Sequence, residues 1–571
     1  MACAENIDGD TRLRHSSAQL SDFGYQQRPS TSQTIPWDGF SSWISCFCVV
    51  TFDLELGQVI EKIYPEHCNL SDTEKANICY LAFPDSNTGC MGDTQFHFRI
   101  RSFSHSIEKS SKVLDTALQK DKSHYYGFVS FRQVKDSSIK RGYFQKSVVL
   151  LTQLPYISLF RYLVKNIAPE YFLNGEVALE TVCYQIDKWP SPYPGQTLQL
   201  PVIGEVLQIA IPQNQLKGVS TKMNKAAVKR LTSSPLEFSC IYQPQIYECF
   251  SSMLPHLHVL WELVLLAEPI IVMAPSPSTC SEGVLSLVSL VQPLAFVCDH
   301  RPYFTIHDSE LKEYTTKTQA PPKVILGVTN PFFAKTFQQW PHIVRIGDMP
   351  SLTIMKNGKR SQDLKPGIYT KYKACLDRDK AFLKKFGKSV NGTRPFEVQN
   401  AMLINYMTEL TQSFMIPLER YIGSLMPLQR SISPWKSPPK LHRFNTEEFM
   451  QTLSTYGPQL TSKMRGNWQL LYRKFFKSPN FEAWFYKKTE EVNYKLDVLH
   501  IEALCQADIE KWLIGKDEVE IVDLYMQMKK KLIRCRNLNF SSDIRNKLHL
   551  QMKNVLKVLP LDLQGIIRKS L

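Results

Sequence analysis

The sequence lacks the motifs that mark most nucleotide-dependent and hydrolytic enzymes. It contains no G-x-x-x-x-G-K-[ST] phosphate loop, no G-x-G-x-x-G fingerprint, no G-x-S-x-G nucleophile elbow and no H-E-x-x-H zinc motif. None of its 14 cysteines forms a C-x-x-C pair, so neither a zinc site nor a disulfide framework is indicated. We therefore expect no catalytic residue, no metal and no cofactor.

Hydrophobic runs long enough to cross a bilayer are also lacking. The most apolar stretch, residues 257–273, carries Glu262, Glu268 and Pro269, whereas a membrane span needs roughly 20 apolar residues. The N-terminus has no apolar signal-peptide core. These features predict a soluble, cytoplasmic protein with free, mostly buried thiols.

Negative charge is scarce relative to positive charge. The formal net charge is +15, which predicts attraction to nucleic acid, an anionic membrane or an acidic protein. Lys529, Lys530 and Lys531 open a basic C-terminal region whose only carboxylates are Asp543 and Asp562. We expect these three lysines to contact a membrane or an acidic partner, although a solvated helix face explains them equally well. Nucleic acid is disfavoured because no binding motif or aromatic platform accompanies the charge.

Composition and periodicity divide the chain into five parts. Residues 1–36 are rich in Ser, Thr, Gln and Asp and are expected to form a disordered arm. An α+β unit is expected at residues 37–215 and a basic linker at residues 216–235. An α/β unit follows at residues 236–394, and a helical region with a basic end occupies residues 395–571.

The first unit shows the pattern of an antiparallel sheet with helices packed on it. "WISCFCVVTFDL" and "QVIEKIYP" flank a turn at Gly57, and about five strands are expected in all. Ser71 and Glu74 have the spacing of a capping box at the start of a helix. In "FHFRIR", residues 96–101, apolar residues alternate with polar ones, which predicts a strand with one wet face.

The second unit has a different pattern. Short apolar runs such as "PIIVMAP" and "PKVILGVTNPF" alternate with helical stretches such as "PHLHVLWELVLLAE". Continuous apolar strands between helices imply a mostly parallel sheet that is covered on both faces. After Pro395 the strand signals fade and long helical periodicity dominates.

Two blocks of the sequence resemble a known family. "FDLELGQVIEKIYP", "LSDTEKANICYLAFPDS" and "GDTQFHFRIR" are similar to the upstream segment of DENN-domain proteins. "LWELVLLAEPIIVMAPSPSTCSEGVLSLVSLVQPL", "PYFTIHD" and "VILGVTNPFF" resemble the central segment. The sequence of the first block is similar to that of the subfamily called DENN-domain-containing protein six.

The resemblance implies an architecture and an activity. The architecture is a longin-like antiparallel lobe, a doubly wound α/β DENN lobe and a helical downstream region. The activity is guanine nucleotide exchange on a Rab GTPase held between the two lobes, with no covalent chemistry. The subfamily is linked with the Rab-fourteen type on recycling endosomes, which implies peripheral association with those membranes. A trafficking adaptor that binds a GTPase or coat protein without exchange is the alternative, and the oligomeric state is left open.

Three residues in loops beside the predicted buried strands are candidates for partner contacts: Asp299, Tyr303 and Asn330. Each has an alternative role within the fold. Asp299 can pair with Arg301, Tyr303 can belong to the core, and Asn330 can shape the turn before Pro331.

Overall fold

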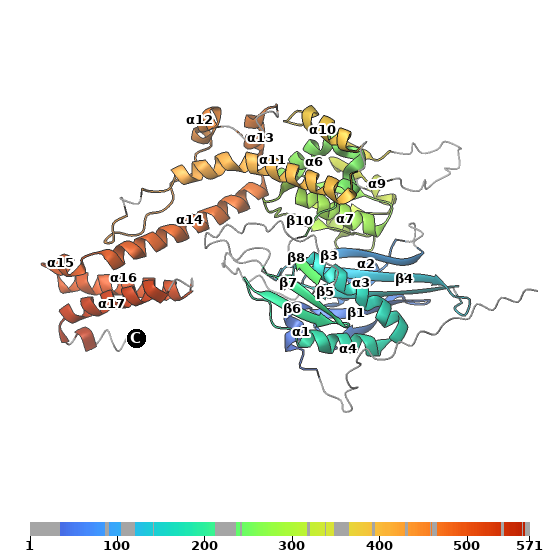
Figure 1. Cartoon of the computed structure of the whole chain (residues 1–571), viewed down its shortest axis with the longest axis horizontal. Helices are drawn as coiled ribbons and strands as arrows, with labels where there is room; N and C mark the ends of the chain where they lie inside the picture. Colours follow the sequence, from blue (N-terminus) through green and yellow to red (C-terminus); the bar gives the residue numbers. More distant parts are fainter. Residues whose placement is uncertain are drawn as a thin grey trace, which may run out of the picture.

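The protein is described here from a computed structural model (Figure 1). The described residues are 35–85, 91–103, 120–140, 142–211, 236–239, 242–316, 320–336, 339–347, 365–390, 394–428, 432–456, 458, 465–537, 542–561 and 563–565. The predicted linker at 216–235 lies outside these residues, as does the predicted arm except for its last two positions.

The upstream lobe is built on an antiparallel five-stranded sheet, as predicted, with strand order β2-β1-β5-β4-β3. Its strands are β1 (Cys46–Asp53), β2 (Gly57–Tyr64), β3 (Gly92–Arg101), β4 (His124–Lys135) and β5 (Tyr143–Thr152). Its helices are α1 (Asp38–Trp43), α2 (Asp72–Leu81), α3 (Ile157–Asn174) and α4 (Glu176–Asp187).

Alternation along the strands places apolar side chains on both faces of this sheet. Phe47 and Val49 of β1 pack with α3 and α4 on one face, whereas Cys48 and Val50 pack with α2 on the other. The capping box of α2 is present as predicted, because the Ser71 N–H donates to Glu74 Oε2 (2.7 Å) and Ser71 Oγ accepts from the Glu74 N–H (3.3 Å).

A second, smaller sheet follows this lobe. It consists of β6 (Thr197–Val202), β7 (Glu205–Ala210) and β8 (Leu236–Ser239) in that order. The β6–β7 hairpin was not predicted from the sequence. Exposed and buried residues alternate strictly along β6, a pattern that is typical of a strand with one buried face. Its buried residues Leu198, Leu200 and Val202 belong to the core of the upstream lobe.

The central lobe contains the expected, mostly parallel sheet. Its strand order is β10-β11-β9-β12-β13, and only the β12–β13 pair is antiparallel. The strands are β9 (Ile270–Met273), β10 (Asp299–Arg301), β11 (Val324–Val328), β12 (His342–Arg345) and β13 (Gly367–Thr370). The helices are α5 (Ile246–Phe250), η2 (Ser251–His256), α6 (Leu257–Leu265), α7 (Pro277–Val288), η3 (Ser289–Val291), α8 (Leu311–Thr315), α9 (Phe332–Thr336) and α10 (Lys380–Val390).

The downstream helices begin by completing this central core. They are α11 (Phe396–Ser424), α12 (Thr446–Tyr456), α13 (Trp468–Phe475), α14 (Pro479–Gln506), α15 (Ile509–Leu513), α16 (Glu518–Asn537) and α17 (Ser542–Val558). Trp261 of α6 donates to Thr411 Oγ1 of α11 (2.9 Å), and Phe414 stacks on Tyr472 of α13. One hydrophobic core includes residues from both sides of Pro395, so the packing does not mark a boundary there. The domain boundary at Pro395 stays a prediction.

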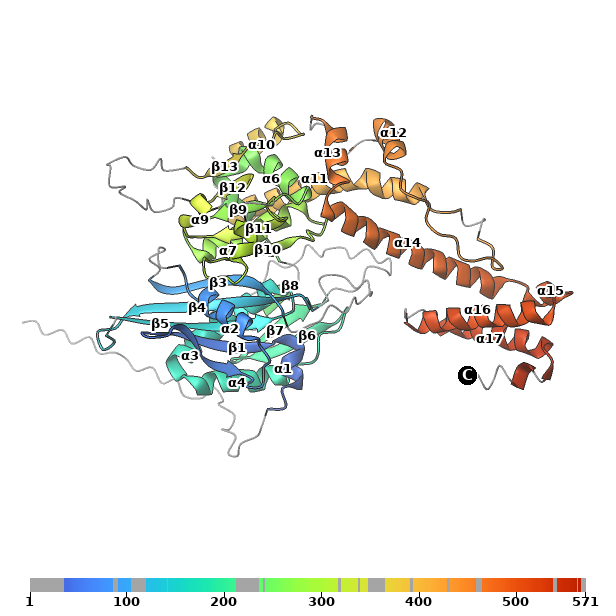
Figure 2. The ribbon, with the colours of Figure 1, turned by 180° about the vertical axis from the view of Figure 1, so that it is seen from behind.

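Helix α14 then leaves the lobes as an arm that carries α15, α16 and α17 at its far end (Figures 1 and 2). Its base is fixed by Asn480, whose side chain donates to the carbonyl oxygens of Val264 and Leu265 at 2.9 and 3.0 Å. None of the described helices combines the length and hydrophobicity that a transmembrane segment requires.

We expect Gly327→Ala to destabilise the central lobe by about 2 kcal/mol, the usual cost of overpacking a core. A Cβ at Gly327 in β11 would lie 2.2 Å from the Pro302 carbonyl oxygen, which belongs to the backbone and cannot move aside cheaply. Gly423→Ala in α11 is the control: its Cβ meets nothing within 4 Å, so alanine should stabilise the helix by up to about 1 kcal/mol. Chemical denaturation measures both, and equal effects would contradict the prediction.

Candidate functional site: the seam and groove between the lobes

The two lobes meet along β3, the edge strand of the upstream sheet. Helix α7 and strand β10 of the central lobe lie against this strand (Figure 1). The predicted wet face of β3 is therefore wrong: His97 is 4% exposed and Arg99 is 8% exposed. Alternation along β3 separates the two faces as expected, but the second lobe covers the polar one.

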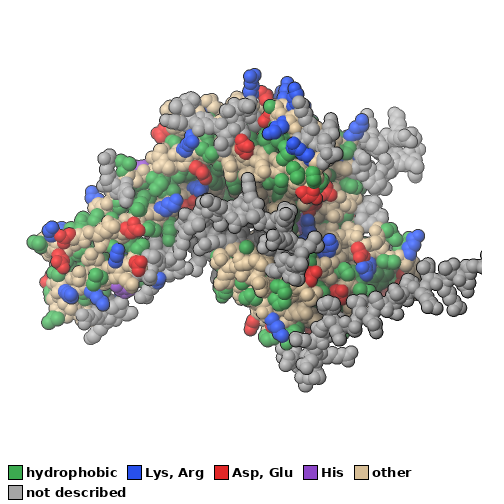
Figure 3. All heavy atoms as spheres, in the orientation of Figure 1, with side chains coloured by type: hydrophobic (Ala, Val, Ile, Leu, Met, Phe, Trp, Pro, Cys, Tyr) green, Lys and Arg blue, Asp and Glu red, His purple; other side chains and the backbone are tan. Residues whose placement is uncertain are grey.

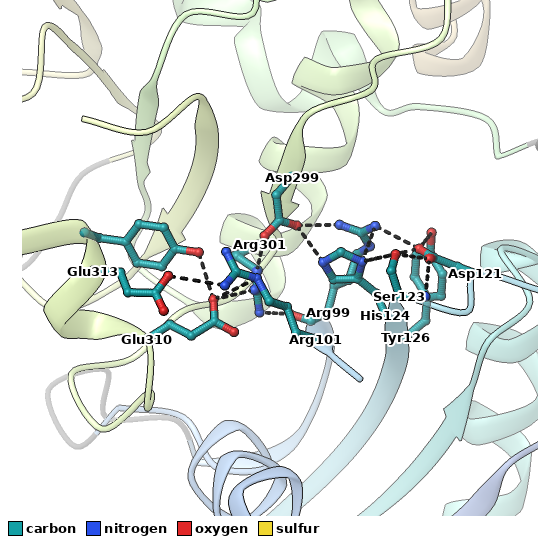
Figure 4. Close-up of polar contacts among 11 residues, drawn as sticks. Arg99, Arg101, Asp121, Ser123, His124, Tyr126, Asp299, Arg301, Glu310 and Glu313 are labelled. Atoms are coloured by element: carbon teal, nitrogen blue, oxygen red, sulfur yellow. Dashed lines mark hydrogen bonds and ion pairs between the residues drawn. The ribbon is translucent and has the colours of Figure 1, made fainter. Parts of the chain in front are cut away.

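Arg99 bridges the lobes with its guanidinium group (Figure 4). One of its nitrogens donates to Asp299 Oδ1 of β10 at 2.5 Å, and another donates to Asp121 Oδ2 of the upstream lobe at 2.8 Å. His124 completes the group, because its Nε2 lies 3.2 Å from Asp299 Oδ1. A buried guanidinium needs such partners, because an unpaired charge away from water is costly.

Arg301 is the second buried arginine of the seam and is 1% exposed. Its Nε donates to Asp299 Oδ2 (2.8 Å), its Nη2 donates to Glu310 Oε2 (2.7 Å) and its Nη1 donates to the Arg99 carbonyl (3.1 Å). Arg101 lies at the rim, where it pairs with Glu310 and Glu313 while remaining 40% exposed. The two arginines of β3, buried Arg99 and half-exposed Arg101, thus differ sharply in their access to solvent.

Opposing effects act on the pKa of Asp299. Burial would raise it, but hydrogen bonding to His124 and the positive charges of Arg301 and Arg99 lower the pKa well below the ordinary range of an aspartate. Asp299 therefore remains a carboxylate throughout the physiological pH range.

The structure buries Tyr303 and Asn330, and it half-buries Asp299, the third sequence-predicted contact residue. Asp299 pairs with Arg301 and Arg99, as described above. Tyr303 is 0% exposed, and its hydroxyl accepts from the Asp85 N–H (2.8 Å). Asn330 is 9% exposed, and its Oδ1 accepts from the Phe332 N–H (2.9 Å) at the start of α9. The alternative role named for each residue is thus present, and direct contact with a partner stays a prediction.

A groove of about 970 Å³ lies beside this seam. The upstream lobe lines it with Phe96, His97, Phe128 and Arg161, whereas the central lobe contributes Ser278, Thr279 and Glu282 of α7. Helix α11 forms a further wall through Glu397, Ala401 and Asn405, which recur every four residues along one face. Both lobes and the downstream helices are therefore needed to form it.

Two charged groups span the groove and one neutral group borders it. Arg161 of α3 forms an ion pair with Glu282 of α7, which also accepts from the Tyr242 hydroxyl. Burial lowers the pKa of His97 well below its ordinary value, and the charge of Arg161 acts in the same direction, so this imidazole is neutral. Its Nε2 is buried and has no hydrogen-bond partner among the described residues.

The predicted C-terminal contact residues lie far from the groove, on α16. Lys530 is exposed, whereas Lys529 and Lys531 are half-buried. Lys531 Nζ lies 2.8 Å from His500 Nδ1 of α14. Because successive residues of a helix point about 100° apart, the three lysines do not form one patch. Their role in membrane or partner contact stays a prediction.

Apart from the Asp299–Arg301 pair, neither the ion network of the seam nor the groove beside it was predicted from the sequence. The available signal was the placement of Arg99 and Arg101 within a β-strand, where buried arginine requires carboxylate partners. Those partners could not be identified, since Asp299 lies 200 residues away along the chain.

The two lobes and the helical extension define a DENN-type architecture, and comparison with known proteins supports this class. Residues 44–186 match the family profile described as "Transport protein Avl9", and residues 243–351 match "Stabilization of polarity axis". Residues 509–570, which contain α15, α16 and α17, match "DENND6 C-terminal domain".

Full-length relatives narrow the class to one family. The chain is 51% identical to the Mus musculus Protein DENND6A over 551 residues, which is 94% of this chain and 91% of that protein. It is 49% identical to the Homo sapiens Protein DENND6B over 557 residues, 95% of each chain. The Dictyostelium discoideum Protein DENND6 homolog is 32% identical, over 88% of this chain and 79% of its own. The chain belongs to the DENND6 family of DENN-domain proteins.

We expect Arg99→Met to lower the free energy of unfolding by about 3 kcal/mol, because it removes a buried guanidinium and leaves the half-buried carboxylates of Asp121 and Asp299 each without one cation. Arg101→Met is the matched control from the same strand. Its exposed ion pairs should contribute less than about 1 kcal/mol. Denaturant titration of both variants tests this, and equal losses would show that the seam does not depend on Arg99.

The buried carboxyl group of Asp308 should make the stability of the fold depend on pH. Burial raises its pKa from 3.8 to about 6 despite the nearby charge of Arg301. A raised carboxyl pKa means that the folded state prefers the proton, so stability falls as pH rises from about 4 to 6. Asp308→Asn keeps an acceptor for the Glu310 N–H and should be more stable by about 3 kcal/mol above pH 6. This advantage should disappear below about pH 4; a constant difference in denaturation midpoints across pH would contradict it.

Proposed function

We propose that this DENND6-family protein is a guanine nucleotide exchange factor for a Rab GTPase. It promotes GDP release and GTP loading on a Rab of the Rab-fourteen type in endosomal recycling traffic, while associated peripherally with recycling endosomes. The observation that carries the proposal is the groove between the lobes, because it presents surfaces from both lobes and from α11 to one partner. Family membership and the resemblance to DENN-domain proteins support the same assignment.

Exchange of this kind requires binding and no covalent step. A protein that holds the nucleotide-free GTPase more tightly than the loaded form lowers the affinity of the GTPase for its nucleotide by the same factor. An interface of roughly 1,600 Å² is the usual size for a specific complex, and two lobes that act together can provide it. The buried seam keeps these lobes in a fixed relation, so little binding energy is spent on ordering them.

The polar lining of the groove suits a protein segment as the occupant. Hydroxyl groups of Ser278 and Thr279, the amide of Asn405 and the imidazole of His97 lie beside the apolar side chains of Phe96 and Phe128. This combination of apolar surface with a few hydrogen-bonding groups is typical of protein interfaces. Glu397 and Glu248 add carboxylates to the groove beyond the Arg161–Glu282 ion pair, and a basic segment of the partner complements them.

The exchange proposal is tested by the rate of labelled-GDP release from a panel of purified Rab GTPases. We expect Ala401→Arg to slow accelerated release at least about tenfold, equivalent to about 1.4 kcal/mol, because the new side chain would project from the exposed groove wall.

Val398→Arg is the control for this experiment. Val398 lies in the same helix and is 44% exposed, but it does not line the groove, so release should change less than about twofold. If no Rab releases GDP faster in the presence of the wild-type chain, the proposal fails. Binding without acceleration would instead identify a trafficking adaptor.

A further inference from the structure

Helix α17 presents an unusual combination of side chains to solvent. Its buried stripe, Leu548, Met552 and Val555, is at most 5% exposed and packs within the α14–α17 module. On the opposite side Leu550 is 61% exposed. Lys553 and Lys557 are also exposed and share this face at helical spacing. Apolar and cationic groups therefore alternate along the outer surface of one helix.

Two further apolar residues are exposed at the end of the helix. Val558 is 53% exposed, and Leu561, just after the helix, is 86% exposed. Figure 3 shows hydrophobic and basic side chains next to each other at this end of the molecule. Exposed leucine and valine side chains beside lysines give this end of the chain the mixed apolar and cationic character of a surface that lies at a membrane interface.

The lysines of this face differ from others nearby in their surroundings. Lys511 pairs with Asp508, Lys516 pairs with Glu520, and Lys531 lies against His500. Within the described part of the chain, no ion pair involves Lys547, Lys553 or Lys557.

The charge of α17 is correspondingly one-sided. Between Ser542 and Val558 the helix carries Arg545, Lys547, Lys553 and Lys557 against a single carboxylate, Asp543. The exposed members of this set, Lys547, Lys553 and Lys557, complement an anionic surface.

We propose that this face of α17 binds the surface of a bilayer that contains anionic lipids. In this arrangement Leu550 and Leu561 enter the boundary between headgroups and acyl chains, and Lys553 and Lys557 extend their ammonium groups to the lipid phosphates. An acidic protein would match the lysines through charge, but a bilayer matches the charge and also covers the exposed leucines. The site differs from Lys529–Lys531 and does not depend on exchange activity.

Flotation of the purified full-length chain with vesicles tests this site. We expect the wild-type protein to float with vesicles of phosphatidylcholine and phosphatidylserine, to float little with phosphatidylcholine alone, and to dissociate as salt rises. Lys553→Gln combined with Lys557→Gln should reduce partitioning about fivefold for each lysine. Leu550→Ser combined with Leu561→Ser should reduce it at both low and high salt, since the apolar contribution is not screened.

Matched controls come from the two lobes. Leu54→Ser removes a leucine that is 60% exposed on the upstream lobe, and Lys371→Gln with Lys373→Gln removes two exposed lysines of the central lobe. These variants should float like wild type, and circular dichroism should show unchanged helix content in all of them. Equal flotation with neutral vesicles, equal loss in the controls, or capture by soluble polyglutamate but not by vesicles would each overturn the proposal.

Discussion

The buried guanidinium groups of Arg99 and Arg301 determine how the two lobes meet. Each carries a full charge out of water, and each is compensated only when carboxylates from defined positions reach it. Apolar packing alone would tolerate sliding of one sheet edge along the other. The shared carboxylate of Asp299, which binds one arginine with each oxygen, permits only a narrow range of positions. The groove beside the seam inherits its shape from this constraint.

Under the proposed function, this constraint accounts for specific recognition of a partner. Chemistry at a reactive side chain can be confined to one loop, whereas recognition of a large partner requires separate surfaces held in register. Here the surfaces come from β3, α7 and α11, which are distant in sequence and joined through a common seam and core. Under the proposed function, the joining of the lobes is what holds these recognition surfaces in place.

Local features of the fold could be predicted from the sequence, but the site could not. The capping box at Ser71 depends on residues three positions apart, and the parallel sheet depends on continuous apolar runs. Both signals are contained within short segments. Burial of Arg99 depends on a strand that follows about two hundred residues later, and periodicity carries no information on that scale. For the same reason Asp299 and Tyr303 were expected at an open loop, although another lobe covers them.

Helix α14 is a single rod of 28 residues, about 42 Å long at 1.5 Å per residue. Its first turn is anchored to the carbonyl end of α6 through Asn480, while Ile501 and Leu504 near its other end belong to the core of the distal module. Because α14 is a continuous helix, it fixes the distance between the two lobes and the distal module. A surface bound by the distal module therefore lies at a set distance from the lobes. A partner that binds between the lobes and also contacts that surface must be long enough to span this distance.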